Sequence, residues 1–361
     1  MVSIIDAMKE LPEGYEESCF TEKAIQRKRG VDNPNDLMML NMFHLINGTS
    51  LMEISLIAKM TKLGELSDVA FMKRFENCNN WFKWINERLA SEGPIEYKKP
   101  EWLEKYRVLA NDASEVSEKG RSGRIYRLHF ALDLFQMKCA QQIITTQETG
   151  EKLTNFQFLK NDLVLADRMY STIQGISHCV ECEADFVLRL RKNSFTLYDS
   201  DNQKIDLLKH LKALGKEKIL NLPVRMKLKN GQMTSVRICA KRKPISYDEQ
   251  NNKKLRRRET RHGIEISPET KDFNKYIVLV TSLENEISAE DILELYRFRW
   301  QVEIYFKRLK SILDFGELPK RRSESVMAWL NGKIMIALLI EKFISKRIFP
   351  PAEEFAAKHL A

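Results

Sequence analysis

The chain has 361 residues, which is long enough for two or three domains with substantial cores. Its composition, with 43% apolar and 30% charged residues, excludes a disordered tail, a fibre and a small disulfide-stapled secreted domain. Lysine and arginine number 59 against 50 acidic residues, and this net charge of +9 favours a polyanionic partner, with nucleic acid as the first candidate.

The sequence predicts a soluble, cytoplasmic protein with no membrane partner. Its six scattered cysteines fit a reducing compartment. The N-terminus has acidic residues where a signal peptide would need an apolar core. No apolar stretch is expected to reach the length of a membrane span, since the run at 334–340 ends at Glu341.

Residues 1–95 are predicted to form a helical DNA-binding domain, because apolar residues recur at three- and four-residue spacing from about Pro34 to Leu89. Ser50 and Glu53 have the spacing of a capping box. A helix that begins at Ser50, a break containing Gly64 and a second helix from Ser67 fit a helix-turn-helix. Two packed helices of a small bundle fit the same pattern equally well.

Residues 92–124 carry prolines, glycines and mixed charges, and a connector is predicted over residues 96–126. Strand-type runs and one strand–helix–strand unit follow, which indicates an α/β core. The predicted strands are residues 127–135, 139–146, 163–170, 185–191 and 276–283, with a helix over 171–183. One long helix is predicted from Ser288 to about residue 313, and a last helix over 324–347.

Residues 193–275 are predicted to be a basic, β-rich insertion. The pair Asn230-Gly231 between two strand-like runs is a hairpin signal. Residues 186–275 contain 23 Lys or Arg and 10 Asp or Glu, a balance of +13 that exceeds the charge of the whole chain. Runs of charge usually belong to solvated loops, but an excess of this size favours contact with phosphates.

Two aspartates occupy positions where a carboxylate is costly. Asp133 lies inside the apolar run LHFALDLF, and Asp167 lies at the end of the run LVLADRMY. A carboxylate in a dry interior needs a cation, hydrogen-bond donors or water at a strand end. Each Asp taken alone could simply pair with a basic neighbour such as Arg168, but together they favour a functional site.

The predicted long helix has one apolar face and one chemical face. At 100° per residue, Tyr296, Arg299, Glu303 and Lys310 share a stripe about 60° wide. An acidic group among cations and a phenol suits a site that holds a metal and a phosphodiester together. The alternative is a solvated stripe in which Glu303 pairs with Arg299 or Lys307.

Three carboxylates from two strands and a helix could hold two hard cations, Mg²⁺ or Mn²⁺. Two such ions about 4 Å apart would activate the attacking oxygen and stabilise the leaving oxygen of an in-line phosphoryl transfer. No nucleophile from the protein is then required.

The stripe matches the signature Tyr, two residues, Arg, three residues, Glu, six residues, Lys. On these residues the chain resembles the DDE transposases of bacterial insertion sequences, specifically the insertion sequence four family. LADRMY at 165–170 is similar to the motif of that family's second aspartate, and ALDLF at 131–135 to the motif of the first. Met169 stands where many members carry Gly, and the chain after Lys310 is shorter than in many relatives.

The resemblance implies an α/β fold with a ribonuclease H-like catalytic core over residues 127–320, interrupted by the basic insertion and followed by a C-terminal helical region over 321–361. It implies a two-metal site of Mg²⁺ or Mn²⁺ on Asp133, Asp167 and Glu303. The residues expected to contact DNA are Tyr296, Arg299, Lys310, Trp300, Arg168 and Lys307.

The implied activity is cut-and-paste DNA transposition, with metal-dependent cleavage at transposon ends, through a hairpin in several members, and strand transfer into target DNA. The implied partners are double-stranded DNA with terminal inverted repeats, target DNA and a second copy of the chain, in a complex associated with the nucleoid. Two alternatives remain: a catalytically inactive transposase-derived DNA-binding protein or repressor, and a ribonuclease H-like nuclease acting on branched or hybrid substrates.

One further motif is weak. His178, Cys179 and Cys182 form H-C-x-x-C, which suits zinc or redox chemistry, yet no second Cys or His pair has ligand spacing. Small residues on a helix face are the favoured interpretation.

Overall fold

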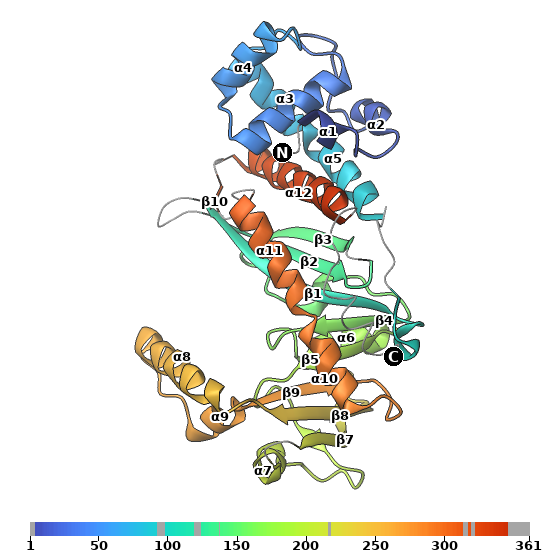
Figure 1. Cartoon of the computed structure of the whole chain (residues 1–361), viewed down its shortest axis with the longest axis vertical. Coiled ribbons are helices and arrows are strands. Elements are labelled where there is room, and N and C mark those ends of the chain that lie inside the picture. The colour runs from blue at the N-terminus through green and yellow to red at the C-terminus, as the bar shows by residue number, and fades with distance from the viewer. Residues whose placement is uncertain are drawn as a thin grey trace. The chain divides into compact units, whose positions relative to one another are not determined.

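The protein is a mixed α/β protein with a large mixed sheet (Figure 1). The computed structural model describes residues 4–91, 98–118, 124–136, 138–215, 218–312, 317–318 and 322–345. The chain divides into two compact units. Unit 1 contains residues 1–97, 113–149 and 303–353, and unit 2 contains residues 98–112, 150–302 and 354–361.

One helix of unit 1 begins with the capping box that the sequence predicts. Ser50 Oγ accepts a hydrogen bond from the Glu53 backbone N–H, and the Glu53 carboxylate accepts one from the Ser50 N–H, so the predicted capping box is confirmed. The helices are α1 (Ile4–Met8), α2 (Tyr15–Thr21), α3 (Pro34–Asn47), α4 (Leu51–Met60), α5 (Asp68–Ser91) and α12 (Ser323–Ser345).

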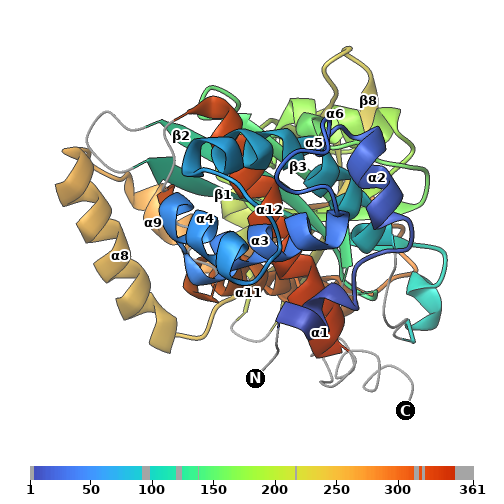
Figure 2. The same ribbon diagram turned by 90° about the horizontal axis from the view of Figure 1, so that it is seen from above.

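Helix α12 is largely buried and packs against α5 and α3 (Figure 2). Its segment Ser323–Ile340 is long and apolar enough to cross a membrane by composition, contrary to the expectation that no stretch would be. However, 78% of that segment is buried inside the structure. A helix covered on several sides needs apolar residues around most of its circumference, so α12 has the composition of a core helix.

Unit 1 also contains a strand hairpin and a covering helix. β2 (Ile125–Asp133) and β3 (Lys138–Thr146) are antiparallel, and β2 lies between β3 and β1 (Arg107–Glu118) in the sheet. The short β10 (Glu317–Leu318) pairs with the end of β1. The ring of Phe306, on α11 (Trp300–Ile312), meets the ring of Phe130 edge to face at 5.9 Å.

Unit 2 is built on a strand–helix–strand unit. The first half of β1 pairs in parallel with β4 (Asp162–Ala166), and β4 pairs in parallel with β5 (Asp185–Arg189). The helix α6 (Ile173–Glu181) connects these two strands. The sheet continues antiparallel through β9 (Tyr276–Thr281), β8 (Met233–Arg242), β7 (Ile219–Lys227) and β6 (Leu197–Tyr198).

The predicted hairpin is confirmed: β7 and β8 are joined across Asn230-Gly231, where Gly231 has a positive φ of 87°. The insertion is less purely β than expected, because helices alternate with its strands. The remaining helices of unit 2 are η1 (Glu101–Leu103), η2 (Leu153–Asn155), α7 (Leu207–Ala213), α8 (Ser246–His262), α9 (Pro268–Phe273) and α10 (Ala289–Arg297).

The stretch predicted to be a connector contains a central strand. β1 spans Arg107–Glu118, and its residues Val108, Leu109 and Ala110 are completely buried. A strand with neighbours on both sides and covered faces has no alternating pattern, so this apolar triplet followed by polar residues was not recognised from sequence. The predicted domain boundaries themselves stay a prediction.

The single long helix predicted from Ser288 is wrong: α10 ends at Arg297 and α11 begins at Trp300. Around the break, backbone N–H groups reach the carbonyl three residues earlier, from Phe298 to Leu295 and from Arg299 to Tyr296. A three-residue turn advances each residue by about 120° rather than 100°. The predicted 60° stripe is therefore interrupted between Tyr296 and Glu303. Ser288 caps α10 as expected, accepting from the Asp291 N–H.

Candidate active site

Asp112 and Asp167 occupy adjacent positions on two paired strands of unit 2. In the parallel pair of β1 and β4, Asn111 lies opposite Ala166, and this is the last pair before β4 ends. Asp112 directly follows Asn111, and Asp167 directly follows Ala166. Because neighbouring strands lie about 4.8 Å apart, the two carboxylates are close together where β4 ends.

Two residues of the signature lie at the same place. Nη1 of Arg299 is 3.8 Å from Oδ2 of Asp112, and the guanidinium lies over the ring of Tyr296, 5.7 Å from its centroid. Tyr296 is only 8% exposed, and its burial raises the pKa of the phenol, while the charges of Arg299 and Arg189 lower it. The phenol therefore keeps its proton at neutral pH and remains able to donate a hydrogen bond.

Asp167 and Arg168, directly after β4, are both held by hydrogen bonds, Asp167 within its own loop and Arg168 to Asn274. Oδ1 of Asp167 accepts a hydrogen bond of 2.8 Å from the Met169 N–H, which leaves its other oxygen outside this turn. Nη1 of Arg168 donates to Oδ1 of Asn274 at 2.8 Å. Burial, with the neighbouring Arg189, lowers the pKa of Arg168 to about 10, so the guanidinium stays charged at neutral pH.

Asp133 has a different environment, in unit 1. It is 2% exposed and ends β2, and its Oδ1 accepts hydrogen bonds of 3.0 Å from the N–H groups of Phe135 and Gln136. These donors stabilise a buried carboxylate within a turn, which is the ordinary structural role of an Asp at such a position.

The remaining predicted residues lie on α11. Glu303 is in the first turn, four residues after Arg299, and its side chain is exposed. Lys307 and Lys310 are exposed on the same helix. Trp300 is 44% exposed at its start, which is unusual for so large an apolar ring.

Asp112 is a candidate site residue that the sequence pattern did not single out. It lies in the stretch taken for a connector, and its neighbours Asn111 and Ala113 do not form an apolar run. The signal that could have found it is an acidic residue two positions after the apolar triplet 108–110, which is comparable to Asp167 directly after the apolar run 163–166.

The donor chemistry of this region fits a hard divalent cation, because carboxylate oxygens are the ligands that Mg²⁺ and Mn²⁺ prefer. Asp112 and Asp167 provide two carboxylates from neighbouring strands. Within the described residues, no group of three or more His, Cys, Asp or Glu side chains is gathered closely enough to hold a metal.

The H-C-x-x-C motif does not form a complete metal site. Cys182 Sγ is 3.9 Å from Nδ1 of His178, whose Nε2 lies 2.8 Å from the carbonyl oxygen of Phe156. Cys179 is fully buried, and burial raises the pKa of its thiol well above its usual range. The thiol is therefore protonated and suits packing rather than metal binding.

Comparison with known proteins gives the family. The model of the transposase DDE domain matches residues 104–339, a span that begins three residues before β1 and includes Asp112. The chain is 28% identical over 352 residues to the InsL protein for insertion sequence element IS186A of Escherichia coli K12, covering 94% of this chain and 93% of that protein. It is also 28% identical over 353 residues to the transposase for insertion sequence element IS421 of Escherichia coli, with the same coverage.

A third relative, the transposase for insertion sequence element IS1151 of Clostridium perfringens, is 38% identical over 87 residues, 23% of this chain and 18% of that protein. The family model covers well over half of the chain, and the relatives at full coverage come from insertion sequences. The chain therefore belongs to the DDE transposases of insertion sequences, as its signature had led us to expect.

Proposed function

We propose that this transposase cleaves DNA at the ends of its element and joins the freed 3′ ends to target DNA, as a cut-and-paste enzyme. The observation that carries the proposal is the cluster of Asp112 and Asp167 on paired strands beside Tyr296 and Arg299. Carboxylates next to a guanidinium and a protonated phenol can bind a metal and a phosphodiester at once.

We assign the three acidic residues as Asp112, Asp167 and Glu303, so that Asp112 takes the place expected for Asp133. The pairing of β1 with β4 and the contact from Arg299 support Asp112. The two backbone donors on Asp133 Oδ1 favour a structural role for that residue. Glu303 remains the third acidic residue of this assignment because of its position in the signature, one helical turn after Arg299.

Asp112, Asp167 and Glu303 would hold Mg²⁺ or Mn²⁺, which supplies Lewis acidity and a stronger oxygen nucleophile when bound. The positively charged side chains of the protein would bind the phosphate group itself. The guanidiniums of Arg299 and Arg168 would hold the non-bridging oxygens of the phosphate, since this planar group forms paired hydrogen bonds with them. The phenol of Tyr296 would donate a further hydrogen bond to the strand near the scissile position.

A ribonuclease H-like core is part of the same proposal. The order β3-β2-β1-β4-β5, with an antiparallel hairpin on one side of β1 and parallel strands on the other, supports it. Crossover units of this kind place functional residues at the carboxyl ends of their strands, which is where Asp167 lies. The proposed DNA substrate is a duplex with terminal inverted repeats, bound by two copies of the chain.

The test uses DNA from the two flanks of the gene, incubated with the full-length protein and Mg²⁺ or Mn²⁺. We expect wild-type protein to cut one strand at a defined position and the Asp167→Asn variant to bind the same DNA without cutting it. Specific binding without cleavage by the wild type under either metal would replace this proposal with an inactive DNA-binding protein. Preference for branched or hybrid substrates would replace it with a nuclease.

A further inference from the structure

Helix α8 is attached to unit 2 through its few acidic residues. Asp248 forms an ion pair of 2.9 Å with Arg242 at the start of the helix. Glu259 forms one of 3.0 Å with Lys271 and also accepts a hydrogen bond from the Ile266 N–H. At 100° per residue Asp248 and Glu259 lie about 20° apart, so they mark a single inward face.

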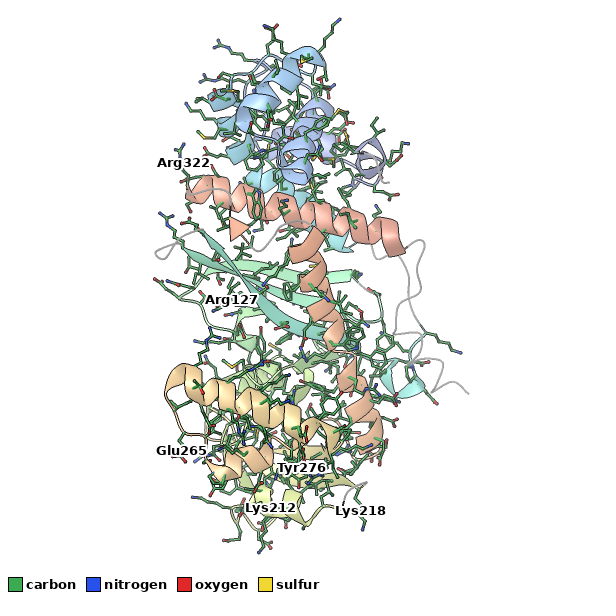
Figure 3. The ribbon with its side chains drawn as sticks, turned by 60° about the vertical axis from the view of Figure 1, so that its left-hand side comes forward. Arg127, Lys212, Lys218, Glu265, Tyr276 and Arg322 are labelled. Atoms are coloured by element: carbon green, nitrogen blue, oxygen red, sulfur yellow. The ribbon has the colours of Figure 1, made fainter. Side chains whose placement is uncertain are left out.

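The opposite side of α8 is almost entirely cationic and exposed. Lys253, Arg257 and Arg261 follow each other at four-residue spacing and are all exposed, as are Lys254 and Arg256. Glu249 is the one exposed acidic side chain among those described on this helix. Figures 1 and 3 show α8 on the outer side of unit 2. Because the inward ion pairs occupy Asp248 and Glu259, the outward face has a strong excess of positive charge.

A second group of cations in unit 2 includes Arg168, which directly follows Asp167. Asn274 joins two of them: its side-chain oxygen accepts from Arg168, and its backbone oxygen accepts from Nζ of Lys243 at 2.6 Å. The positive charge of Arg189, at the end of β5, lowers the pKa of both Arg168 and Lys243. The Nε–H groups of Arg168 and Arg189 are buried and have no hydrogen-bond partner in the part of the chain that is described. Both side chains are partly exposed, and a guanidinium has several N–H donors that can bind a phosphate oxygen.

The two groups are connected through Lys243 and Lys254. The charge of Lys254, on α8, acts on Lys243, which stands next to Arg168 and Arg189. Arg168 in turn directly follows Asp167. Positive charge therefore continues from the candidate active site to the exposed face of α8, all within unit 2.

We propose that Arg189, Lys243 and the outer face of α8 bind the phosphates of the DNA that flanks the element, outside the scissile position. This inference rests on the proposed function. The DNA beside an inserted element differs from one insertion to the next, so it must be bound without reading bases. Lysine and arginine on a helix exterior provide that type of contact, because phosphate contacts position a duplex without carrying sequence information.

The length of α8 determines how many base pairs of DNA it can contact. Its 17 residues span about 25 Å, the length of roughly seven base pairs. Binding should therefore depend on the length of the flank as well as on salt.

The experiment compares two end substrates, one with 20 base pairs of flanking DNA (about 68 Å) and one cut to two base pairs (about 7 Å). The variant replaces Lys253, Lys254, Arg257 and Arg261 with Gln in the full-length protein. We expect the salt dependence of its binding to the long substrate to fall by about 3 to 4 in log–log slope, from ~0.9 per lost phosphate contact. Its affinity for the long substrate should fall about tenfold or more at low salt, and its affinity for the short substrate should match that of the wild type.

Two controls accompany the variant. Replacing the exposed Lys204, Lys209, Lys227 and Lys229 with Gln removes the same charge from other parts of unit 2 and should leave both affinities unchanged. Exchanging Lys for Arg and Arg for Lys at the four α8 positions retains the charge and should preserve the salt slope.

The alternative outcomes are distinct. Equal losses on the long and short substrates would overturn the inference by placing α8 on the element's end, and a defect confined to strand transfer into a target plasmid would place it on target DNA. Unchanged binding by the variant would also overturn it. If the wild type cuts neither substrate, the proposed function fails instead, and flank-dependent binding still decides the role of α8.

Discussion

Nη1 of Arg299 lies 3.8 Å from Oδ2 of Asp112, although 187 positions separate them in the numbering of the chain. Arg299 belongs to the signature of the family, whereas Asp112 lies on β1, in a stretch that had been taken for a connector. The contact joins the signature to the centre of the sheet, and it changes which carboxylates are expected to perform catalysis.

The assignment of the first carboxylate predicts opposite results for two Asp→Asn variants. Asp112→Asn should reduce DNA cleavage about 100-fold or more, because loss of a metal ligand removes several kcal/mol of transition-state stabilisation. Asp133→Asn should retain cleavage, since an Asn side-chain oxygen can still accept from Phe135 and Gln136. Single-turnover cleavage of an end substrate measures both. Normal cutting by Asp112→Asn together with loss of cutting by Asp133→Asn would return the role to Asp133.

The ion pair at the start of β1 should stabilise the alignment of the two strands. Nε and Nη2 of Arg107 each lie 2.7 Å from an oxygen of Asp162, whose side chain is 2% exposed. Asp162→Ala should lower the free energy of unfolding by about 2–3 kcal/mol, less than for a fully buried pair because the Arg107 side chain is 36% exposed. Chemical denaturation provides the measurement. Lys160→Ala, which breaks an exposed pair with Glu183, is the control and should change stability little.

Gly332 of α12 lies in a tightly packed part of unit 1. A Cβ at this position would lie 2.6 Å from Cδ1 of Leu45, which is completely buried. Gly332→Ala should therefore destabilise the protein by about 1–3 kcal/mol, despite the better helix propensity of Ala. In a double-mutant cycle with Leu45→Ala, the combined loss should be smaller than the sum of the two single losses. Additive losses would show that the two side chains do not compete for the same space.

Lys243 should make stability depend on pH. Burial, together with the charges of Arg189, Arg168 and Lys254, lowers the pKa of Lys243 to about 8, and Asp248 opposes this. Between pH 8 and 10.5 the unfolded chain binds more protons at this residue than the folded chain, so this contribution to stability increases as pH rises through that window. Comparing urea unfolding of the wild type and Lys243→Gln at pH 7.5 and 9.5 tests the sign. A wild type that loses more stability than the variant over this interval contradicts the assignment.

The same residue should link protons to DNA binding. A bound phosphate favours the protonated amine, so DNA binding above pH 8 should take up a proton at Lys243, and affinity should weaken as pH rises from 8 to 9.5. Lys243→Arg keeps its charge over this range and should bind with little dependence on pH. Fluorescence titrations at constant ionic strength compare the two proteins. Identical pH profiles would exclude Lys243 from the phosphate site.

Local patterns determined a large part of this protein from sequence alone. The capping box at Ser50, the Ser288 cap and the Asn230-Gly231 hairpin were predicted correctly, because each depends on hydrogen bonds or backbone angles within a few residues. The family also followed from sequence, since the signature is a set of residue types at fixed spacing.

Tertiary structure alone decided the rest. β1 is a strand because β4 pairs with it, and Asp112 lies beside Asp167 because of the register of that pair; neither partner is encoded in the residues around Asp112. The break at Phe298 and Arg299 contains no proline or glycine, so helical periodicity continued through it unnoticed. The sequence marked the basic run as a candidate for phosphate contact, but the ion pairs of Asp248 and Glu259 on α8 decided which side of the helix is available for it. Pairing between distant segments depends on the folding of the whole chain, so a local pattern of neighbouring residues does not predict it.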